Sequence, residues 1–347
     1  MKKVFSILLP LLLILFITAC SDSGTLPAGS ESSPATEAEA SLPAESESEA
    51  VTEEPAVTVE RPTGTKVKVV MIAGQSNAVG YAFDSSLLTT DPRYDAARVE
   101  KLRAGNEKVL IRYSNNPLES GDSGVQFGPH ENETFEPVAF GQGCASPFTG
   151  YYSIGPEVGL AEALSNAYPD ETFYIVKCAT SGANLSNRWN SGLTLVENNL
   201  YQQMIDFTKE AMLQLEADGL APEIVAFCWM QGESDAQEGN LFSYPIMFED
   251  LINGFKAELA RYIPDNGMAV VDAGITQFWP SYQTMNKMKQ RFQSWSNKHF
   301  YFDTNDLPLN SDNAHYDGFS QFELGNRFGR GVIEAIGMMG EAEIYNH

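Results

Sequence analysis

Ser76 has the sequence setting of an activated serine nucleophile. It follows a short run of apolar, mostly β-branched residues at 67–72 and lies two positions after Gly74, a residue type that permits a tight turn. A serine hydroxyl is a weak nucleophile until a neighbouring base takes its proton, and histidine is the side chain with a suitable pKa. The pattern therefore predicts acyl-transfer chemistry at Ser76, provided that a histidine lies beside it.

His315 is the best candidate for that base among the four histidines. His347 ends the chain, His299 precedes an expected strand, and His130 lies in an irregular stretch. Asp312 precedes His315 by three positions and can reach the imidazole within one local turn. A carboxylate in that place fixes the tautomer of the base and stabilises the imidazolium, which predicts a Ser-His-Asp triad.

The oxyanion that develops on an ester carbonyl needs fixed hydrogen-bond donors. The backbone N–H of Ser76 is one candidate. The backbone N–H of Gly182 is a second, because glycine allows close approach, and the side-chain amide of Gln231 is a third, because it donates without charge.

Alternating strand and helix patterns predict how these residues are positioned. Strands are expected at 67–72, 173–177, 224–230, 269–273 and 300–303, and helices at 156–168, 196–215, 242–262, 282–296 and 319–336. Such alternation is typical of an α/β fold with a parallel sheet, whose ligands bind at the carboxyl ends of the strands. The candidate residues all follow strands and are expected to meet there.

Four sequence blocks in this order resemble the SGNH hydrolases, and more narrowly the branch of sialate O-acetylesterases and acetylxylan esterases, carbohydrate esterase family 6. A Gly-Pro-Glu segment at 155–157 fits the same branch. The resemblance spans roughly residues 67–337. The four blocks are Gly74-Gln75-Ser76-Asn77, Ser181-Gly182-Ala183-Asn184, Trp229-Met230-Gln231-Gly232-Glu233-Ser234-Asp235 and Asp312-Asn313-Ala314-His315.

The resemblance implies a three-layer α/β/α sandwich and O-deacetylation of a carbohydrate, with no metal or cofactor. It implies Ser76 as nucleophile, His315 as base and Asp312 as the residue that orients it. Gln231 stands where other SGNH enzymes have Asn, and Glu233 is expected to add a hydrogen bond near the site or to hold its loop. Two positions depart from the pattern: Ala78 where Met is frequent, and Ser181 where the family shows a second glycine.

Other side chains near these blocks are candidates for support or substrate binding. Gln75 and Asn77 flank the serine. Arg188 is a candidate to grip a sugar carboxylate, and Trp189 is expected either to stack on a sugar or to cover its own loop. Three cysteines remain open as free thiols or disulfide partners, namely Cys144, Cys178 and Cys228.

The N-terminal segment has the pattern of a lipoprotein signal peptide followed by a disordered linker. Residues 1–20 hold two lysines and an apolar run, and end in Ile-Thr-Ala-Cys, which resembles a bacterial lipobox with Cys20 as the lipidated residue. Residues 21–63 are rich in Ser, Glu, Ala and Pro and are expected to be a disordered acidic linker. The esterase-like domain is expected at 64–347, with a loop insertion, or a modest subdomain, at about 84–155.

Charge and composition limit the partners. The formal net charge of −24 disfavours nucleic acid, because it repels phosphate backbones. The expectation is a bacterial cell-surface esterase, lipid-anchored to the membrane, facing outside the cytoplasm and acting on an acetylated carbohydrate. A non-catalytic carbohydrate-binding protein of this fold and an esterase or lipase for other short-chain esters are the alternatives. The sequence leaves open the glycan (xylan, another plant glycan or sialic acid), the acetylated position and the oligomeric state.

Overall fold

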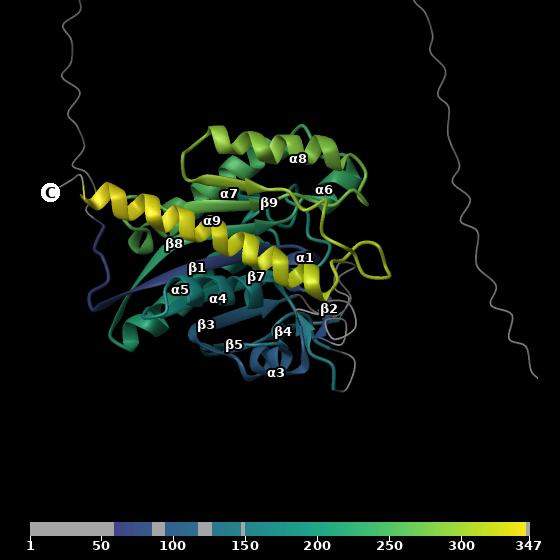
Figure 1. The fold of residues 1–347 in the computed structure, drawn as a ribbon. Coiled ribbons are helices and arrows are strands. Elements are labelled where there is room, and N and C mark those ends of the chain that lie inside the picture. The colour runs from purple at the N-terminus through teal and green to yellow at the C-terminus, as the bar shows by residue number, and fades with distance from the viewer. Residues whose placement is uncertain (1–58, 85–93, 117–126, 147–149, 345–347) are drawn as a thin grey trace, which may run out of the picture. The chain divides into compact units, whose positions relative to one another are not determined.

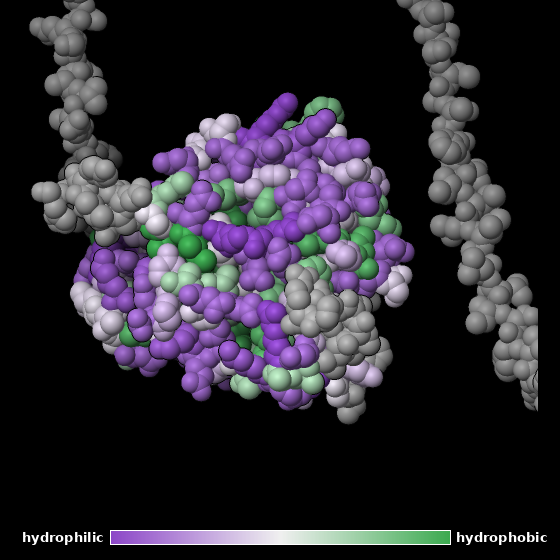
Figure 2. Space-filling view, in the orientation of Figure 1, coloured by the Kyte–Doolittle hydropathy of each residue, from purple (hydrophilic) through white to green (hydrophobic). Residues whose placement is uncertain are grey.

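The computed structural model describes residues 59–84, 94–116, 127–146 and 150–344. The expected lipoprotein signal with Cys20 lies outside these ranges, as does most of the expected linker at 21–63. No helix within the described ranges is long and apolar enough to cross a membrane. Figure 2 shows mainly hydrophilic side chains on the visible face, interrupted by small apolar patches.

A twisted sheet forms the centre of the fold, in the strand order β10-β9-β8-β1-β7-β3-β4, with β5 also paired to β3. Neighbouring strands from β10 to β3 all run parallel, whereas β4 and β5 run antiparallel to β3. A separate antiparallel pair joins β2 and β6. The strands are β1 (Thr65–Gly74), β2 (Ala82–Phe83), β3 (Asn106–Asn115), β4 (His130–Glu131), β5 (Glu136–Val138), β6 (Ser153–Ile154), β7 (Phe173–Ala179), β8 (Leu220–Met230), β9 (Ala269–Ala273) and β10 (His299–Phe302).

Helices cover both faces of the sheet, which confirms the predicted three-layer α/β/α class (Figure 1). Alternate residues of β9 show the two sides: Val271 meets Gly331 of α9, whereas its neighbour Asp272 pairs with Lys289 of α8. The helices are α1 (Ser76–Val79), α3 (Ala96–Ala104), α4 (Pro156–Ala167), α5 (Leu200–Ala217), α6 (Glu233–Glu238), α7 (Tyr244–Glu258), α8 (Tyr282–Arg291) and α9 (Gly318–Ile344).

The expectation that about 84–155 is an insertion of loops, or a modest subdomain, is wrong in one respect. This range contains α3 and β3, and β3 pairs in parallel with β7 along seven residues, so it belongs to the central sheet. Its sequence, NEKVLIRYSN, alternates between buried and less buried positions instead of forming an apolar run. The pattern that marks a strand covered on both faces is therefore absent.

Close packing of α4 against α9 fixes where the last helix begins. A Cβ added at Gly159 would lie 1.9 Å from the carbonyl oxygen of Phe322, and one at Gly325 would lie 2.0 Å from that of Pro156. Only glycine allows the two backbones to approach so closely. The segment just before α9, which carries Asp312 and His315, is positioned by this crossing.

A buried ion pair ties α1 to the sheet and to α4. The Lys177 ammonium on β7 lies 2.6 Å from the Glu157 carboxylate, and both side chains are fully buried. Lys177 also donates to the carbonyl oxygens of Val79, at the end of α1, and of Gln142. Burial raises the pKa of Glu157 and lowers that of Lys177, and the attraction between them opposes both shifts. The Glu of the Gly-Pro-Glu segment thus holds the element that begins with Ser76.

The buried His299 at the start of β10 predicts a pH-dependent stability. Its ring packs against those of Phe248 and Phe292, with centroids 5.8 and 5.7 Å away. Burial, with the positive charges of Lys289 and Lys256, lowers the pKa of His299 to about 4. An unfolded histidine titrates near 6.5. Between these values the unfolded chain binds a proton that the native protein does not, so stability is lost as the pH falls from about 6.5 to about 4.

The expected decrease in the free energy of unfolding is at most about 1.4 kcal/mol per pH unit in that window. Urea unfolding of the wild type and of His299→Gln, at half-unit steps of pH, measures it as the difference between the two proteins. A difference that does not vary between pH 4 and 6.5 would show that His299 titrates normally in the fold.

Candidate active site

The turn that carries Ser76 is built at the carboxyl end of β1. Gly74 has a φ of 146°, and a Cβ there would lie 2.0 Å from the carbonyl oxygen of Met230 on β8. The N–H of Gln75 donates to the same carbonyl at 3.0 Å. Ser76 then begins α1 and is 4% exposed. The chain thus turns sharply away from the sheet, and Ser76 is almost fully buried.

Asp312 and His315 form a hydrogen-bonded pair before α9. The Asp312 Oδ2 lies 2.7 Å from His315 Nδ1, and its Oδ1 accepts from the backbone N–H groups of Ala314 and His315 at 2.8 and 2.9 Å. Burial alone would raise the pKa of Asp312, but these hydrogen bonds bring it below its usual range. The ionised carboxylate accepts a hydrogen bond from Nδ1–H and so favours the tautomer in which Nε2 of His315 carries no proton and can act as a base.

Asn77 connects this pair to the serine. Its Oδ1 accepts from the N–H of Tyr316 at 3.2 Å, and its Nδ2 is 3.4 Å from the carbonyl oxygen of Ala314. These are the two residues that flank His315. The same Nδ2 donates to the buried Glu233 at 3.0 Å. The residue next to Ser76 therefore holds the backbone on both sides of His315, which links the Asp312–His315 pair to the serine turn.

Replacing Asn77 by alanine is expected to lower kcat about 100-fold with little change in KM, because the loss loosens His315 without touching substrate. The free energy of unfolding should also fall by about 1–3 kcal/mol, since Glu233 and the Tyr316 N–H lose a partner. Steady-state kinetics on a chromogenic acetate ester and urea unfolding measure the two effects.

Asn132→Ala is the matched control for Asn77→Ala. The Asn132 amide also bridges a backbone N–H, that of Tyr113, and a carbonyl, that of Ile111, but in the β3 region. This variant should lose stability and keep its kcat. Equal losses of kcat in both variants would mean that Asn77 acts only on general stability.

An aromatic stack supports the imidazole, and the sequence did not predict it. The rings of Tyr81 and His315 are stacked with centroids 4.8 Å apart, and Phe127 stacks on Tyr81 at 5.3 Å. The Tyr81 hydroxyl accepts from Nδ2 of Asn116, whose Oδ1 accepts from the N–H of Ser181 at 2.8 Å. One chain of contacts therefore runs from the base to the loop of Gly182. No local pattern marks Tyr81 or Asn116, because their contacts join segments far apart in the chain.

Two of the three groups expected to donate to the oxyanion have an N–H that forms no other hydrogen bond to a described residue. In the part of the chain that the structure describes, the backbone N–H groups of Ser76 and Gly182 donate to no other group. The expectation for Gln231 is corrected. Its side chain is fully buried, and its Nε2 donates to Asp235 at 2.7 Å, with further contacts to Ala183 and Gln75. Gln231 holds the loops together beneath the site.

The neighbours of Gln231 show the same structural role. Gln75 Oε1 accepts from both Gln231 and the N–H of Ser234, which joins the serine turn to the start of α6. The carbonyl oxygen of Gln231 accepts from the buried Lys289, itself paired with Asp272 at 2.8 Å. The hydrogen bonds that Gln75 and Gln231 form between the loops explain why glutamine stands at both positions.

The remaining candidates divide into buried and open positions. Trp189 is fully buried, edge-on to Trp229 at 5.2 Å, so the sugar-stacking expectation for it is wrong and the loop-covering one fits. Glu233 is fully buried, burial raises its pKa, and it holds Asn77. Arg188 is half-buried, and its role toward a carboxylate stays a prediction.

The three described cysteines answer a question that the sequence left open. Cys144, Cys178 and Cys228 are free and buried. Burial raises the pKa of each thiol. They act as small apolar side chains of the core.

The three-layer fold, with a serine after the first strand and an Asp-His pair before the last helix, is the arrangement expected from the resemblance to the SGNH hydrolases. Residues 66–334 match the family described as carbohydrate esterase, sialic acid-specific acetylesterase. The chain belongs to this family and is an O-acetylesterase.

Solved structures share the fold. An X-ray structure of a protein from Arabidopsis thaliana is 19% identical, with a TM-score of 0.55, and the match covers 79% of this chain and 99% of that one. The crystal structure of NanS is 17% identical, with a TM-score of 0.53, and the match covers 79% and 98%. No protein with a curated description matches the sequence.

Proposed function

We propose that the protein removes acetyl groups from an acetylated glycan through an acetyl-enzyme on Ser76. The observation that carries this proposal is the Asp312–His315 pair, held by Asn77 against the serine turn. Family membership supplies the ester class, and the free N–H groups of Ser76 and Gly182 match the needs of a tetrahedral intermediate.

The reaction follows from the geometry in two halves. His315 Nε2 takes the proton of the Ser76 hydroxyl as its oxygen attacks the acetyl carbonyl, and the ionised Asp312 stabilises the imidazolium. The N–H groups of Ser76 and Gly182 donate to the oxyanion. The sugar leaves as an alcohol with the proton from His315. A water molecule, deprotonated by His315, then attacks the acetyl-enzyme, and acetate leaves as Ser76 regains its proton.

The substrate is the finer part of the proposal. The family description names sialic acid, whereas the net charge of −24 slows the approach of highly acidic polymers. An acetylated glycan that carries its acid on single sugar units, as a terminal sialic acid does, fits both, and a neutral acetylated glycan fits the charge alone. Acetate release from acetylated xylan and from O-acetylated N-acetylneuraminic acid, measured side by side, tests this. Turnover of neither, with turnover of longer acyl esters only, would overturn the carbohydrate substrate.

The location is a separate part of the proposal. Residues 1–20 with Cys20 support lipid anchoring and a position outside the cytoplasm, with residues 21–63 as the tether. Fractionation of cells expressing the full chain or Cys20→Ala is the test. The wild type should remain with the membrane and carry a metabolically incorporated fatty acid, and the variant should do neither. Membrane retention without incorporated lipid would contradict the anchor.

A further inference from the structure

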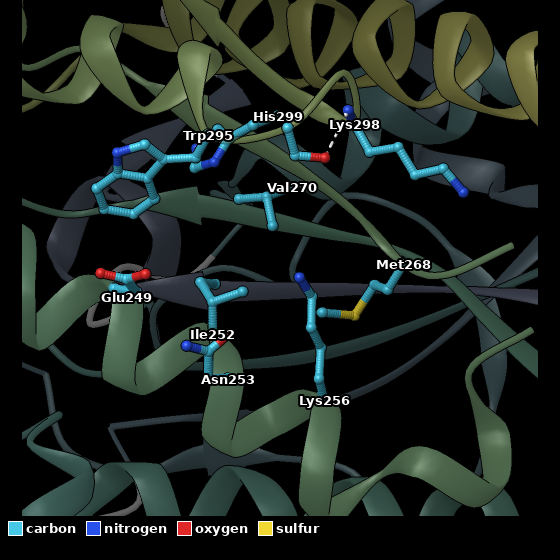
Figure 3. Close-up of a pocket in the computed structure, with 10 residues that line it drawn as sticks. Glu249, Ile252, Asn253, Lys256, Met268, Val270, Trp295, Lys298 and His299 are labelled. Atoms are coloured by element: carbon cyan, nitrogen blue, oxygen red, sulfur yellow. Dashed lines mark hydrogen bonds between the residues drawn. The ribbon is translucent and has the colours of Figure 1, made fainter.

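A cavity of about 140 Å³ opens at the end of the sheet opposite to Ser76. It lies between α7 and the first residues of β9 and β10 (Figure 3), where Val270 pairs with His299. Ser76, in contrast, follows the carboxyl end of β1. Nothing in the proposed esterase reaction uses this cavity. Its polar and aromatic lining includes Glu249, Asn253, Lys256, Trp295, Lys298 and His299.

Two lysines and one glutamate are among the residues that line the cavity. Lys256 and Lys298 both line it, and no carboxylate in the described ranges forms an ion pair with either. The Lys298 ammonium is buried without a hydrogen-bond partner among the described residues. In Figure 3, Lys256 extends from α7 toward Val270. Figure 3 shows the Lys298 side chain directed away from Lys256 and Trp295, so Lys256 is the cation placed to meet an anionic group of a ligand in the cavity.

A buried polar atom in the wall also lacks a partner. His299 is 8% exposed, and its Nε2 makes no hydrogen bond to any described group. Its ring is held between those of Phe292 at 5.7 Å and Trp295 at 6.1 Å. Buried polar atoms are normally satisfied, so an unpaired nitrogen at a cavity wall indicates a place for a ligand hydroxyl or carboxylate.

The opening of the cavity offers a fixed aromatic face. Trp295 is 44% exposed, and its indole packs on Phe292 with centroids 4.3 Å apart. Figure 3 shows it across the cavity from Glu249. Indole faces pack well on flat, partly apolar ligands. The volume is well below the roughly 300–1,000 Å³ of sites for drug-sized ligands, and it suits a single small ring.

We propose that this cavity is a second carbohydrate site, which binds one carboxylate-bearing sugar unit such as a uronic or sialic acid. The carboxylate lies at Lys256, and the ring packs on Trp295. The hydroxyls meet Glu249, Asn253 and the His299 Nε2. A plain inorganic anion would use Lys256 and leave the indole and the α7 carboxylate unused. The site would hold an acidic sugar at the end of the domain opposite to Ser76, whichever ester the enzyme cleaves.

Direct binding tests this proposal on the whole protein. Calorimetric titration with glucuronic acid, N-acetylneuraminic acid, glucose and inorganic phosphate should show saturable binding of the two acid sugars. Glucose and phosphate should each bind at least about tenfold more weakly than the acid sugars, because each lacks one half of the recognition.

Two variants locate the site. Lys256→Gln and Trp295→Ala should each weaken acid-sugar binding at least about tenfold while kcat on a chromogenic acetate ester stays unchanged. The exposed Lys287→Gln and Phe242→Ala are matched controls that should bind as the wild type does. All four replaced side chains are exposed, so the variants are expected to fold, and thermal unfolding verifies it.

Three results would overturn the proposal. One is the absence of saturable acid-sugar binding. Another is binding that neither Lys256→Gln nor Trp295→Ala weakens, which would place it elsewhere. The third is phosphate binding as tight as that of the acid sugars and insensitive to Trp295→Ala, which would make the cavity a simple anion site. Because the readout is binding, failure here leaves the esterase proposal standing, and loss of esterase activity would leave this site standing.

Discussion

Ser76→Ala is expected to lower kcat by about 10³- to 10⁶-fold on any acetate ester that the wild type cleaves, because no acetyl-enzyme can form without the hydroxyl. The residual rate would come from the donors of the turn, which the substitution keeps. Ser76 is 4% exposed and its side chain takes part in no described hydrogen bond, so stability should change little. Acetate release and urea unfolding measure the two quantities.

Ser165→Ala is the matched control for Ser76→Ala. The Ser165 hydroxyl on α4 accepts from Asn106 at 2.9 Å and lies outside the site. This variant should retain full activity. If Ser76→Ala kept more than about a tenth of the wild-type kcat, well above what a lost nucleophile leaves, the serine would not be the nucleophile.

Asp312→Asn is expected to lower kcat by about 10²- to 10⁴-fold near neutral pH. The asparagine oxygen can still accept the N–H groups of Ala314 and His315, so the turn should persist. Its amide nitrogen, however, would donate where the carboxylate accepts, and the His315 proton would move to Nε2. The base would then face Ser76 in the wrong tautomer, and the imidazolium would lose its counter-charge. Kinetics with the pH held between 6 and 8 measure the loss.

Asp306→Asn tests whether loss of any carboxylate in this loop has the same effect. Asp306 pairs with Arg327 at 2.5 Å, and that contact lowers its pKa, with burial opposing the shift. Because the Asp306 side chain is 65% exposed, solvent screens the pair, so a loss of stability of about 0–1 kcal/mol and an unchanged kcat are expected. Equal losses of activity in the two variants would mean that Asp312 serves the loop and not the base.

The sequence allowed five of the six parallel strands of the central sheet to be predicted, because each is an apolar run that ends in a polar block. β3 was missed, since it lies next to the antiparallel strands β4 and β5 and one side of it is only partly covered. Arg112 of β3 shows this: its guanidinium packs 4.8 Å from the Phe207 ring and pairs with the exposed Glu210. Such a strand has the alternating pattern of a half-buried one.

The candidate site shows a similar division. The Asp312–His315 hydrogen bond and the position of Ser76 directly after β1 could be predicted, because each residue lies in a short block with a local turn, whereas their catalytic roles stay predictions. The side chains of Gln231 and Trp189 were not, since residue type does not say whether a polar or aromatic group faces the site or the core. Tyr81 and Asn116 join segments that only the folded sheet brings together, so a single sequence holds no local signal for them.

The central claim is that Ser76 carries the acetyl group during turnover, and trapping that intermediate tests it most directly. The protein is quenched in acid during steady-state turnover of 4-nitrophenyl acetate, digested and examined by mass spectrometry. We predict the added mass of one acetyl group on the peptide that contains Ser76, and its absence in Ser76→Ala. An acetyl group found on a different residue at a rate that matches turnover, or sustained turnover with no acetylated peptide in the wild type or in Asp312→Asn, would contradict the account.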